Sequence, residues 1–299
     1  MRPVWDATVR RARARHFLFE RDYMDYHSDR HADGSLLVLY DGRPLGALPA
    51  SRTGDEVISH GGLTFGGLLS SSSLTTKRAI NALEAILAAL SLDGVQRLVY
   101  KPMPHHYHVV PAEEDLYALQ ALGARLVQRD VSAAIPPSDP PPYSSERRRA
   151  VRRGHDAGLE IGESDRIEEF MMLVAEVLDK RHGLTPVHTP AEMRLLFDRF
   201  RGQIRLFVAN SDEEVVAGTL VYETPMVAHA QYIANGPRGR ELCAGDALID
   251  HLLRGVYREK WFDFGISNDA RGLNPGLMRN KEGFGARAVV HDRYALELV

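Results

Sequence analysis

The sequence is poor in cysteine, has no long apolar run and carries little net charge. Its single cysteine, Cys243, excludes an internal disulfide and a zinc site built from several cysteines, and it favours a reducing compartment. No stretch approaches the ~20 apolar residues that a membrane-spanning helix needs, and the arginine-rich N-terminus lacks the apolar core of a signal peptide. A formal charge of -3 argues against a general DNA-binding surface, so any polyanion contact must be local. These absences predict a cytoplasmic protein.

Several common catalytic motifs are also missing. The sequence contains no Walker phosphate loop and no G-x-G-x-x-G run, which removes the best support for a nucleotide hydrolase or a Rossmann enzyme. It contains no G-x-S-x-G elbow, and a lone cysteine without a partner motif is weak evidence for covalent catalysis. The chemistry must therefore be sought elsewhere.

A proline-rich segment divides the chain. The 299 residues are 44% hydrophobic and 26% charged, an ordinary globular composition that allows two domains. Residues 136–142 contain five prolines, which can continue neither a helix nor a central strand. We therefore expect two domains, 1–142 and 143–299.

The same order of elements is expected on both sides of this segment. Turn residues between apolar stretches predict a hairpin in each half, followed by a third strand, an amphipathic helix and a further strand. In the first half these are 36–40, 44–48, 60–67, 80–90 and 97–100; in the second they are 204–209, 215–222, 227–234, 248–256 and 261–264. Helices at 166–180 and 191–200 precede the second hairpin. The duplicated order predicts an α/β fold with mixed sheets.

The C-terminal strand leads to a segment that contains Lys281. Glycines at 276, 283 and 285 predict a loop that turns tightly and approaches a ligand, while the ammonium group offers a charge to an oxyanion or a phosphate. The same residues are equally compatible with a surface loop and a solvated lysine.

Two basic or glycine-containing segments could bind an anion. Gly245, Asp246 and Ala247 open a predicted helix whose free N–H groups favour a pyrophosphate, although glycine also serves simply to shape such a turn. Arg149 and Arg152 lie three residues apart in an arginine-rich helix, so they can share a face and grip one phosphate. A solvated charged face explains the same pattern.

Histidine and tyrosine residues supply the remaining candidates. His229 and Tyr232 lie on the predicted strand 227–234 and could act as general base or acid, or could simply be packed. The group His105, His106 and His108 lacks a nearby carboxylate, so we expect no metal site there.

The combination resembles the tandem acetyltransferase-like (GNAT) proteins of the FemABX type. Three segments carry the resemblance: the arginine-rich run 148–161, the run 245–249, and 262–265 together with Leu273, Asn274 and 281–285. The resemblance covers roughly residues 30 to 299 and implies two tandem GNAT-like domains.

The resemblance also implies a function. It implies transfer of an acyl or aminoacyl group to the amine of a small, phosphate-linked or similar acceptor, without a tightly bound cofactor, with acyl-CoA or aminoacyl-tRNA as the co-substrate. Lys281 would then stabilise the oxyanion or a donor phosphate, and Asn274 would contact substrate. Arg149 and Arg152 would contact the phosphates of the acceptor. Lys101 and Tyr107, from the first domain, would contribute to the acceptor site.

Two departures from the family pattern bear on the donor. Leu242 stands where acyl-CoA enzymes usually have Gln or Arg, and Asn280 precedes Lys281 where an aromatic residue is common. A standard coenzyme A pyrophosphate site and tRNA use are both weakened by these differences. The alternative is a non-catalytic GNAT pair that binds a nucleotide-sugar or an RNA end.

Overall fold

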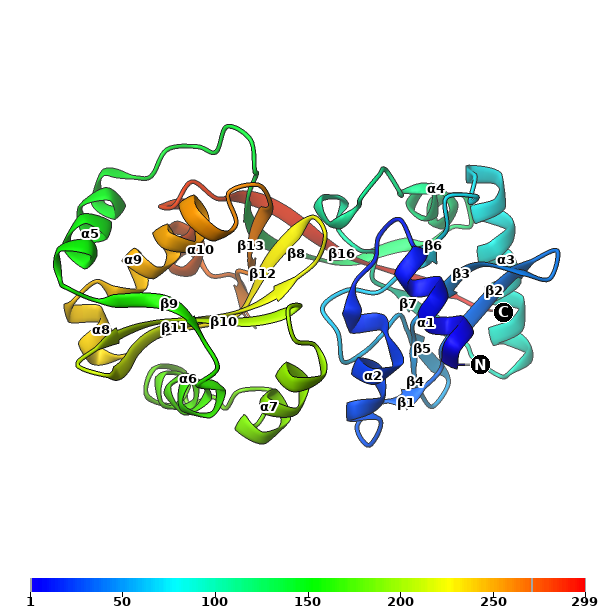
Figure 1. The fold of residues 1–299 in the computed structure, drawn as a ribbon. Helices are drawn as coiled ribbons and strands as arrows, with labels where there is room; N and C mark the ends of the chain where they lie inside the picture. Colours follow the sequence, from blue (N-terminus) through cyan, green and yellow to red (C-terminus); the bar gives the residue numbers. More distant parts are fainter. Residues whose placement is uncertain (1, 270, 299) are drawn as a thin grey trace. The chain divides into compact units, whose positions relative to one another are not determined.

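The computed structural model describes residues 2–269 and 271–298, except the side chains of Arg181 and His182, and it has the expected mixed α/β architecture (Figure 1). The chain forms two compact units. Unit 1 comprises Met1–Val131 and Val290–Val299, and unit 2 comprises Ser132–Val289. Unit 1 thus includes the C-terminal strand, whereas the sequence places a single division between residues 142 and 143.

Unit 1 contains a mixed sheet, a small antiparallel sheet and four α-helices among its described residues. Its helices are α1 (Arg2–Arg11), α2 (Arg21–Met24), α3 (Thr76–Leu92) and α4 (Glu114–Ala121), with 3-10 turns at Phe17–Phe19, Asp25–His27 and His105–Tyr107. The mixed sheet has the order β1 (Ala32–Asp33), β4 (Ser51–Thr53), β5 (Glu56–Ile58), β7 (Arg97–Tyr100) and β16 (Arg287–Glu297). The small sheet contains β2 (Leu36–Tyr40), β3 (Arg43–Leu48) and β6 (Leu69–Ser70).

The core of unit 1 lies between α3 and these sheets. The apolar face of α3 buries Leu83, Ile86 and Leu90 against Leu48 and Leu98 of the strands. The hairpin of β2 and β3 is confirmed, because Asp41 (φ 49°) and Gly42 (φ 72°) both adopt the left-handed conformation that a tight hairpin turn needs.

The strand expected at 60–67 is wrong. This segment is a loop that begins with His60 at φ 50°, and its glycines pack too closely for side chains. A Cβ atom at Gly66 would lie 2.1 Å from the carbonyl oxygen of Ser59. The ammonium of Lys101 donates to the carbonyl oxygens of His60 and Leu63, which fixes the loop. Glycine therefore indicated close backbone approach here rather than a strand.

Unit 2 contains a run of hydrogen-bonded strands and most of the candidate residues. Its sheet has the order β8 (Arg125–Ile135), β13 (Trp261–Ile266), β12 (Val227–Asn235), β11 (Glu214–Glu223), β10 (Ile204–Ser211) and β9 (Glu160–Ser164). The helices are α5 (Ser145–Asp156), α6 (Ile167–His182), α7 (Pro190–Arg199), α8 (Pro237–Glu241), α9 (Ala244–His251) and α10 (Pro275–Glu282). A π-helical turn, Leu252–Val256, continues α9, and β14 (Asn268–Asp269) pairs with β15 (Gly272–Leu273).

Helices cover both faces of the sheet in unit 2. Helices α6 and α7 contact β10, β11 and β12 on one face, and α9 contacts the same strands on the other, with α5 packed against α9 (Figure 1). Strand β12 is antiparallel to β11 and parallel to β13. The hairpin of β10 and β11, the following strand and the helix start at Pro190 are confirmed. No helix in the described residues has both the length and the apolar character needed to cross a membrane.

Candidate functional site

The parallel strands β12 and β13 pair over only three residues each. The last pair in the described residues is His229 with Asp263, after which β12 continues to Asn235 and β13 to Ile266. A bulge in β12 lies at the same point, because Tyr232 pairs with Leu220 of β11 whereas Ala230 pairs with the next residue of that strand. Bulges re-aim side chains and are common beside active sites. The end of this ladder is therefore where chemistry can be placed.

His229 and Asp263 form the centre of this region. The Nδ1 atom of His229 lies 3.5 Å from Oδ2 of Asp263, whose side chain is fully buried. The other oxygen, Oδ1, accepts hydrogen bonds from the hydroxyl of Ser132 at 2.7 Å and from the backbone N–H of Gly265 at 2.8 Å. A buried carboxylate needs such partners, and here they fix its orientation so that Oδ2 faces the imidazole.

Lys281 lies on a helix, so the loop expected around it is wrong. Asn274 caps helix α10 by accepting from the N–H of Leu277 at 3.0 Å, and Pro275 occupies the first helical turn. An N-cap asparagine followed by proline is a strong helix start, and this signal was present in the sequence. Of the three glycines, only Gly285 has a positive φ, 89°, and it follows the end of the helix.

The ammonium group of Lys281 faces β13. It donates to the carbonyl oxygens of Gly265 at 2.7 Å and Ile266 at 3.0 Å, and to the hydroxyl of Ser267 at 3.0 Å. Burial lowers the pKa of Lys281 to about 8, although the charge of Asp263 acts in the opposite direction. Three acceptors occupy all three ammonium donors, so this side chain holds the segment after Asp263 in place.

Tyr232 pairs with a histidine that the sequence did not single out. Its hydroxyl lies 2.7 Å from Nδ1 of His188, and the backbone N–H of His188 donates to the same oxygen at 3.3 Å. His188 is buried just before the capping box of α7, in which Thr189 and Glu192 cap one another. The capping box could be found in the sequence, but the hydrogen bond between His188 and Tyr232 could not.

The first turn of α9 is packed by protein. Ala247 is fully buried, and the carboxylate of Asp246 forms an ion pair with Arg147 of α5. A Cβ atom at Gly154 of α5 would lie 2.5 Å from the carbonyl oxygen of Cys243, so the two helices are in close contact here. Gly245 is half-buried, and donor binding at 245–247 stays a prediction.

Comparisons with known proteins concern the fold that carries these residues. Residues 143–271 match the model of the acetyltransferase (GNAT) domain. The crystal structure of FemX superposes with a TM-score of 0.70 at 11% identity, over 98% of this chain and 95% of that one. The chain has the FemABX-like GNAT fold.

Other solved structures share this FemABX-like fold. The C-terminal domain of a putative lysylphosphatidylglycerol synthetase from Agrobacterium fabrum has a TM-score of 0.63 at 13% identity, covering 98% of this chain and 90% of that one. L-PGS from Bacillus licheniformis has a TM-score of 0.57 at 12% identity, covering 92% and 90%. No curated protein sequence matches this chain. The domain match and the fold support acyl transfer to an amine as the general class of activity.

Arg149 and Arg152 are exposed on α5 of the FemABX-like fold. Neither forms an ion pair within the part of the chain that the structure describes, and both lie on the helix that packs against the start of α9. Their role in binding phosphate stays a prediction. Asn274 uses its side-chain oxygen to cap α10 and its amide nitrogen to bind Asp269 at 3.5 Å, and its substrate contact stays a prediction.

Lys101 and Tyr107 belong to unit 1. Burial lowers the pKa of Lys101 to about 7, and its ammonium holds the loop at His60. Tyr107 is buried within an aromatic cluster, with its ring 4.7 Å from that of Phe65. A role in acceptor binding stays a prediction for both residues. Among the described residues, no group of histidine, cysteine or acidic side chains is arranged to hold a metal ion.

Proposed function

We propose that this chain is an acyltransferase that forms an amide, moving an acyl or aminoacyl group from acyl-CoA or aminoacyl-tRNA to the amine of a small acceptor. The domain match and the FemABX-like fold support this class of reaction. The observation that carries the proposal is the pair of His229 and Asp263 at the point where the ladder between β12 and β13 stops.

His229 is the proposed general base. With its Nδ1–H directed at the fixed carboxylate of Asp263, its Nε2 atom is left to accept a proton from the attacking amine. The amine nitrogen bonds to the donor carbonyl carbon, whose oxygen becomes an oxyanion. When the oxyanion collapses, the bond from carbon to sulfur or to ester oxygen breaks, and the leaving thiolate or alkoxide takes a proton.

Tyr232 is the proposed source of that second proton. Its hydroxyl already exchanges hydrogen bonds with His188, which positions it and can resupply the proton. Lys281 supports the site by fixing the residues after Asp263. The oxyanion role expected for Lys281 would require an anion to displace one of its three acceptors.

We infer that a phosphate-bearing donor is held by Arg149 and Arg152 rather than by the first turn of α9. The contacts of Asp246 and Gly154 support this inference, because Arg147 and the neighbouring helix α5 already occupy that turn. The two exposed guanidinium groups have no competing ion pair among the described residues.

The proposal is tested by amide formation with a panel of amines and amino sugars, using acetyl-CoA and charged tRNA as separate donors. His229→Gln is expected to lower turnover on the order of 10²-fold or more, as loss of a general base does, with an unchanged melting temperature. Asp263→Asn should lower turnover while shifting the pH profile, because the imidazole loses its anionic partner. His251→Gln, on α9, is the matched control. Parental rates in His229→Gln at saturating substrates would refute the proposed base.

A further inference from the structure

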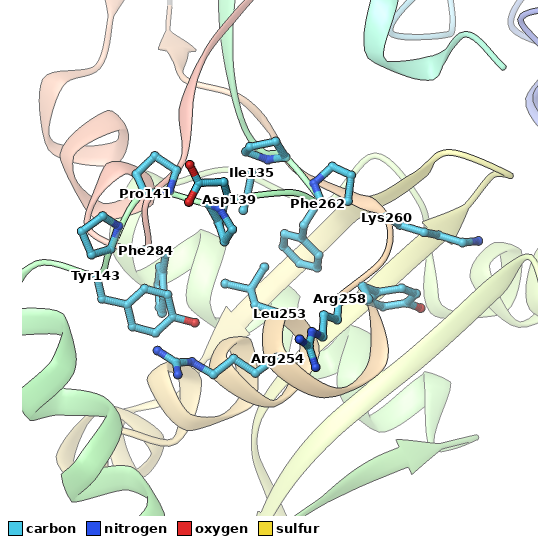
Figure 2. Close-up of a pocket in the computed structure, with 15 residues that line it drawn as sticks. Ile135, Asp139, Pro141, Tyr143, Leu253, Arg254, Arg258, Lys260, Phe262 and Phe284 are labelled. Carbon is cyan, nitrogen blue, oxygen red and sulfur yellow. The ribbon is translucent and has the colours of Figure 1, made fainter. Parts of the chain in front are cut away.

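Unit 2 contains a cavity that the proposed chemistry does not use. It has a volume of about 520 Å³ and lies beneath the proline-rich segment, above the end of α9 (Figure 2). Phe262 forms part of its wall, whereas the adjacent Asp263 takes part in the site with His229. Successive side chains of a strand point to opposite faces, so the cavity and the proposed site lie on different sides of β13.

Apolar and aromatic side chains form about half of the surface that lines the cavity. Prolines of the segment 136–142 form one side, and Leu253, Phe262 and Phe284 form another. The two phenylalanines are buried. Phe262 belongs to β13 and Phe284 follows α10, so regular structure holds both in place. The volume lies within the range of pockets that hold small organic ligands, about 300–1,000 Å³. A rigid, proline-lined cavity of this size suits a flat or chain-like apolar body.

Two arginines give the cavity its charge. Arg254 and Arg258 both line it, and the guanidinium of Arg254 is stacked over the ring of Tyr143 at 4.8 Å from its centroid. Arg254 bonds Asp250 through Nε at 2.8 Å, while Arg258 is exposed and forms no ion pair with any described residue. Lys260, at the rim, is already bound by Glu223 at 2.6 Å. The carboxylate of Asp139 also lines the cavity and would repel an anion, so an anion should bind on the side of the arginines.

The helix that carries these residues is irregular at this place. The turn Leu252–Val256 is π-helical and contains both Leu253 and Arg254. A π-helical turn widens the helix at a cost in backbone geometry, and such turns occur frequently at functional sites. Here the irregularity coincides with the floor of the cavity.

We propose that this cavity binds an organic acid with an apolar or aromatic body, its acid group held by Arg258. The proposal does not depend on the proposed acyl transfer. Carboxylates and phosphate monoesters share the required chemistry, and a neutral ligand of the same shape should bind more weakly.

Calorimetry with three naphthalene probes tests this site: 2-naphthoate, 2-naphthyl phosphate and the neutral 2-naphthamide. We expect at least one acid to bind the parent protein 10-fold or more tightly than the amide, and the better acid identifies the acid class. Arg258→Gln should abolish that preference, and Leu253→Trp, which fills the cavity, should weaken all three probes at least 10-fold. Arg201→Gln, an exposed arginine outside the cavity, should behave like the parent.

Three outcomes would overturn the proposal. The first is that none of the probes binds the parent protein at millimolar concentration. The second is that Arg258→Gln keeps the preference for acids and only lowers the melting temperature, because cations near a helix C-terminus also stabilise the helix. The third is that Leu253→Trp, folded by circular dichroism, binds the probes as the parent does.

Discussion

Replacing Lys281 by methionine should destabilise unit 2 in a way that grows with pH. The pKa of this lysine falls from an ordinary 10.5 to about 8 in the folded protein. Between these values the unfolded chain binds the proton and the folded chain does not, so the parent gains stability as pH rises. The gain is at most on the order of 3 kcal/mol, since one pKa unit corresponds to about 1.4 kcal/mol.

The size of the effect follows from two opposing contributions. Methionine leaves the carbonyl oxygens of Gly265 and Ile266 without their donor, which costs about 1–3 kcal/mol for each buried acceptor. At pH 7 the variant also avoids burying a charge, and this offsets most of the loss. At pH 10 the parent lysine is largely neutral when folded, so no offset remains. We expect near-parental stability at pH 7 and a deficit of about 2–4 kcal/mol at pH 10.

The assay is urea unfolding at four pH values from 7 to 10. The chain has two tryptophans, Trp5 in unit 1 and Trp261 in unit 2, so a Trp5→Phe background makes fluorescence report on unit 2 alone. Lys101, whose pKa is also lowered, is present in both proteins and cancels in the difference. Lys180→Met, at an exposed surface ion pair, is the control and should stay within about 0.5 kcal/mol of the parent throughout. A parent-to-variant gap that stays constant or narrows with pH would refute the reasoning.

Gly154→Ala should lower the stability of unit 2 by about 1–3 kcal/mol, because the new Cβ would lie 2.5 Å from the carbonyl oxygen of Cys243; an unchanged denaturation midpoint would show that α5 can move away from α9. Replacing Arg149 and Arg152 together by glutamine should leave the melting temperature unchanged while making binding of charged tRNA or acyl-CoA weaker and less salt-dependent, and equal salt slopes for both proteins would rule out the phosphate role. Tyr232→Phe should lower kcat in the amide-forming assay with little change in KM, whereas a raised KM with an unchanged kcat would point to a binding role.

Local patterns identified most of the elements in the FemABX-like fold. The hairpin of β2 and β3 follows from the Asp-Gly turn between two apolar stretches, and the start of α7 follows from Pro190. These signals act over a few residues, so they are readable without the tertiary structure. Two predictions were wrong because of glycines. In 60–67 the glycines allow close packing rather than a strand, and near Lys281 they suggested a loop although Asn274 and Pro275 begin helix α10.

The sequence predicted some residues of the candidate site but not how they pair. His229, Tyr232 and Lys281 could be named from their types and positions, but nothing in the sequence pairs His229 with Asp263. That pairing depends on the parallel register of β12 and β13, which are joined through two helices and a π-helical turn.

Tertiary packing also decided what each side chain is free to do. The ammonium of Lys281 is occupied by three acceptors, and Tyr232 is hydrogen-bonded to His188, from which α7, β10 and β11 separate it in the chain. Composition and periodicity determine which segments become buried helices and strands, because those preferences depend on near neighbours in the chain. The partner of a buried polar group depends on strand register and helix packing, which arise from contacts between distant residues, and only the folded structure could decide them.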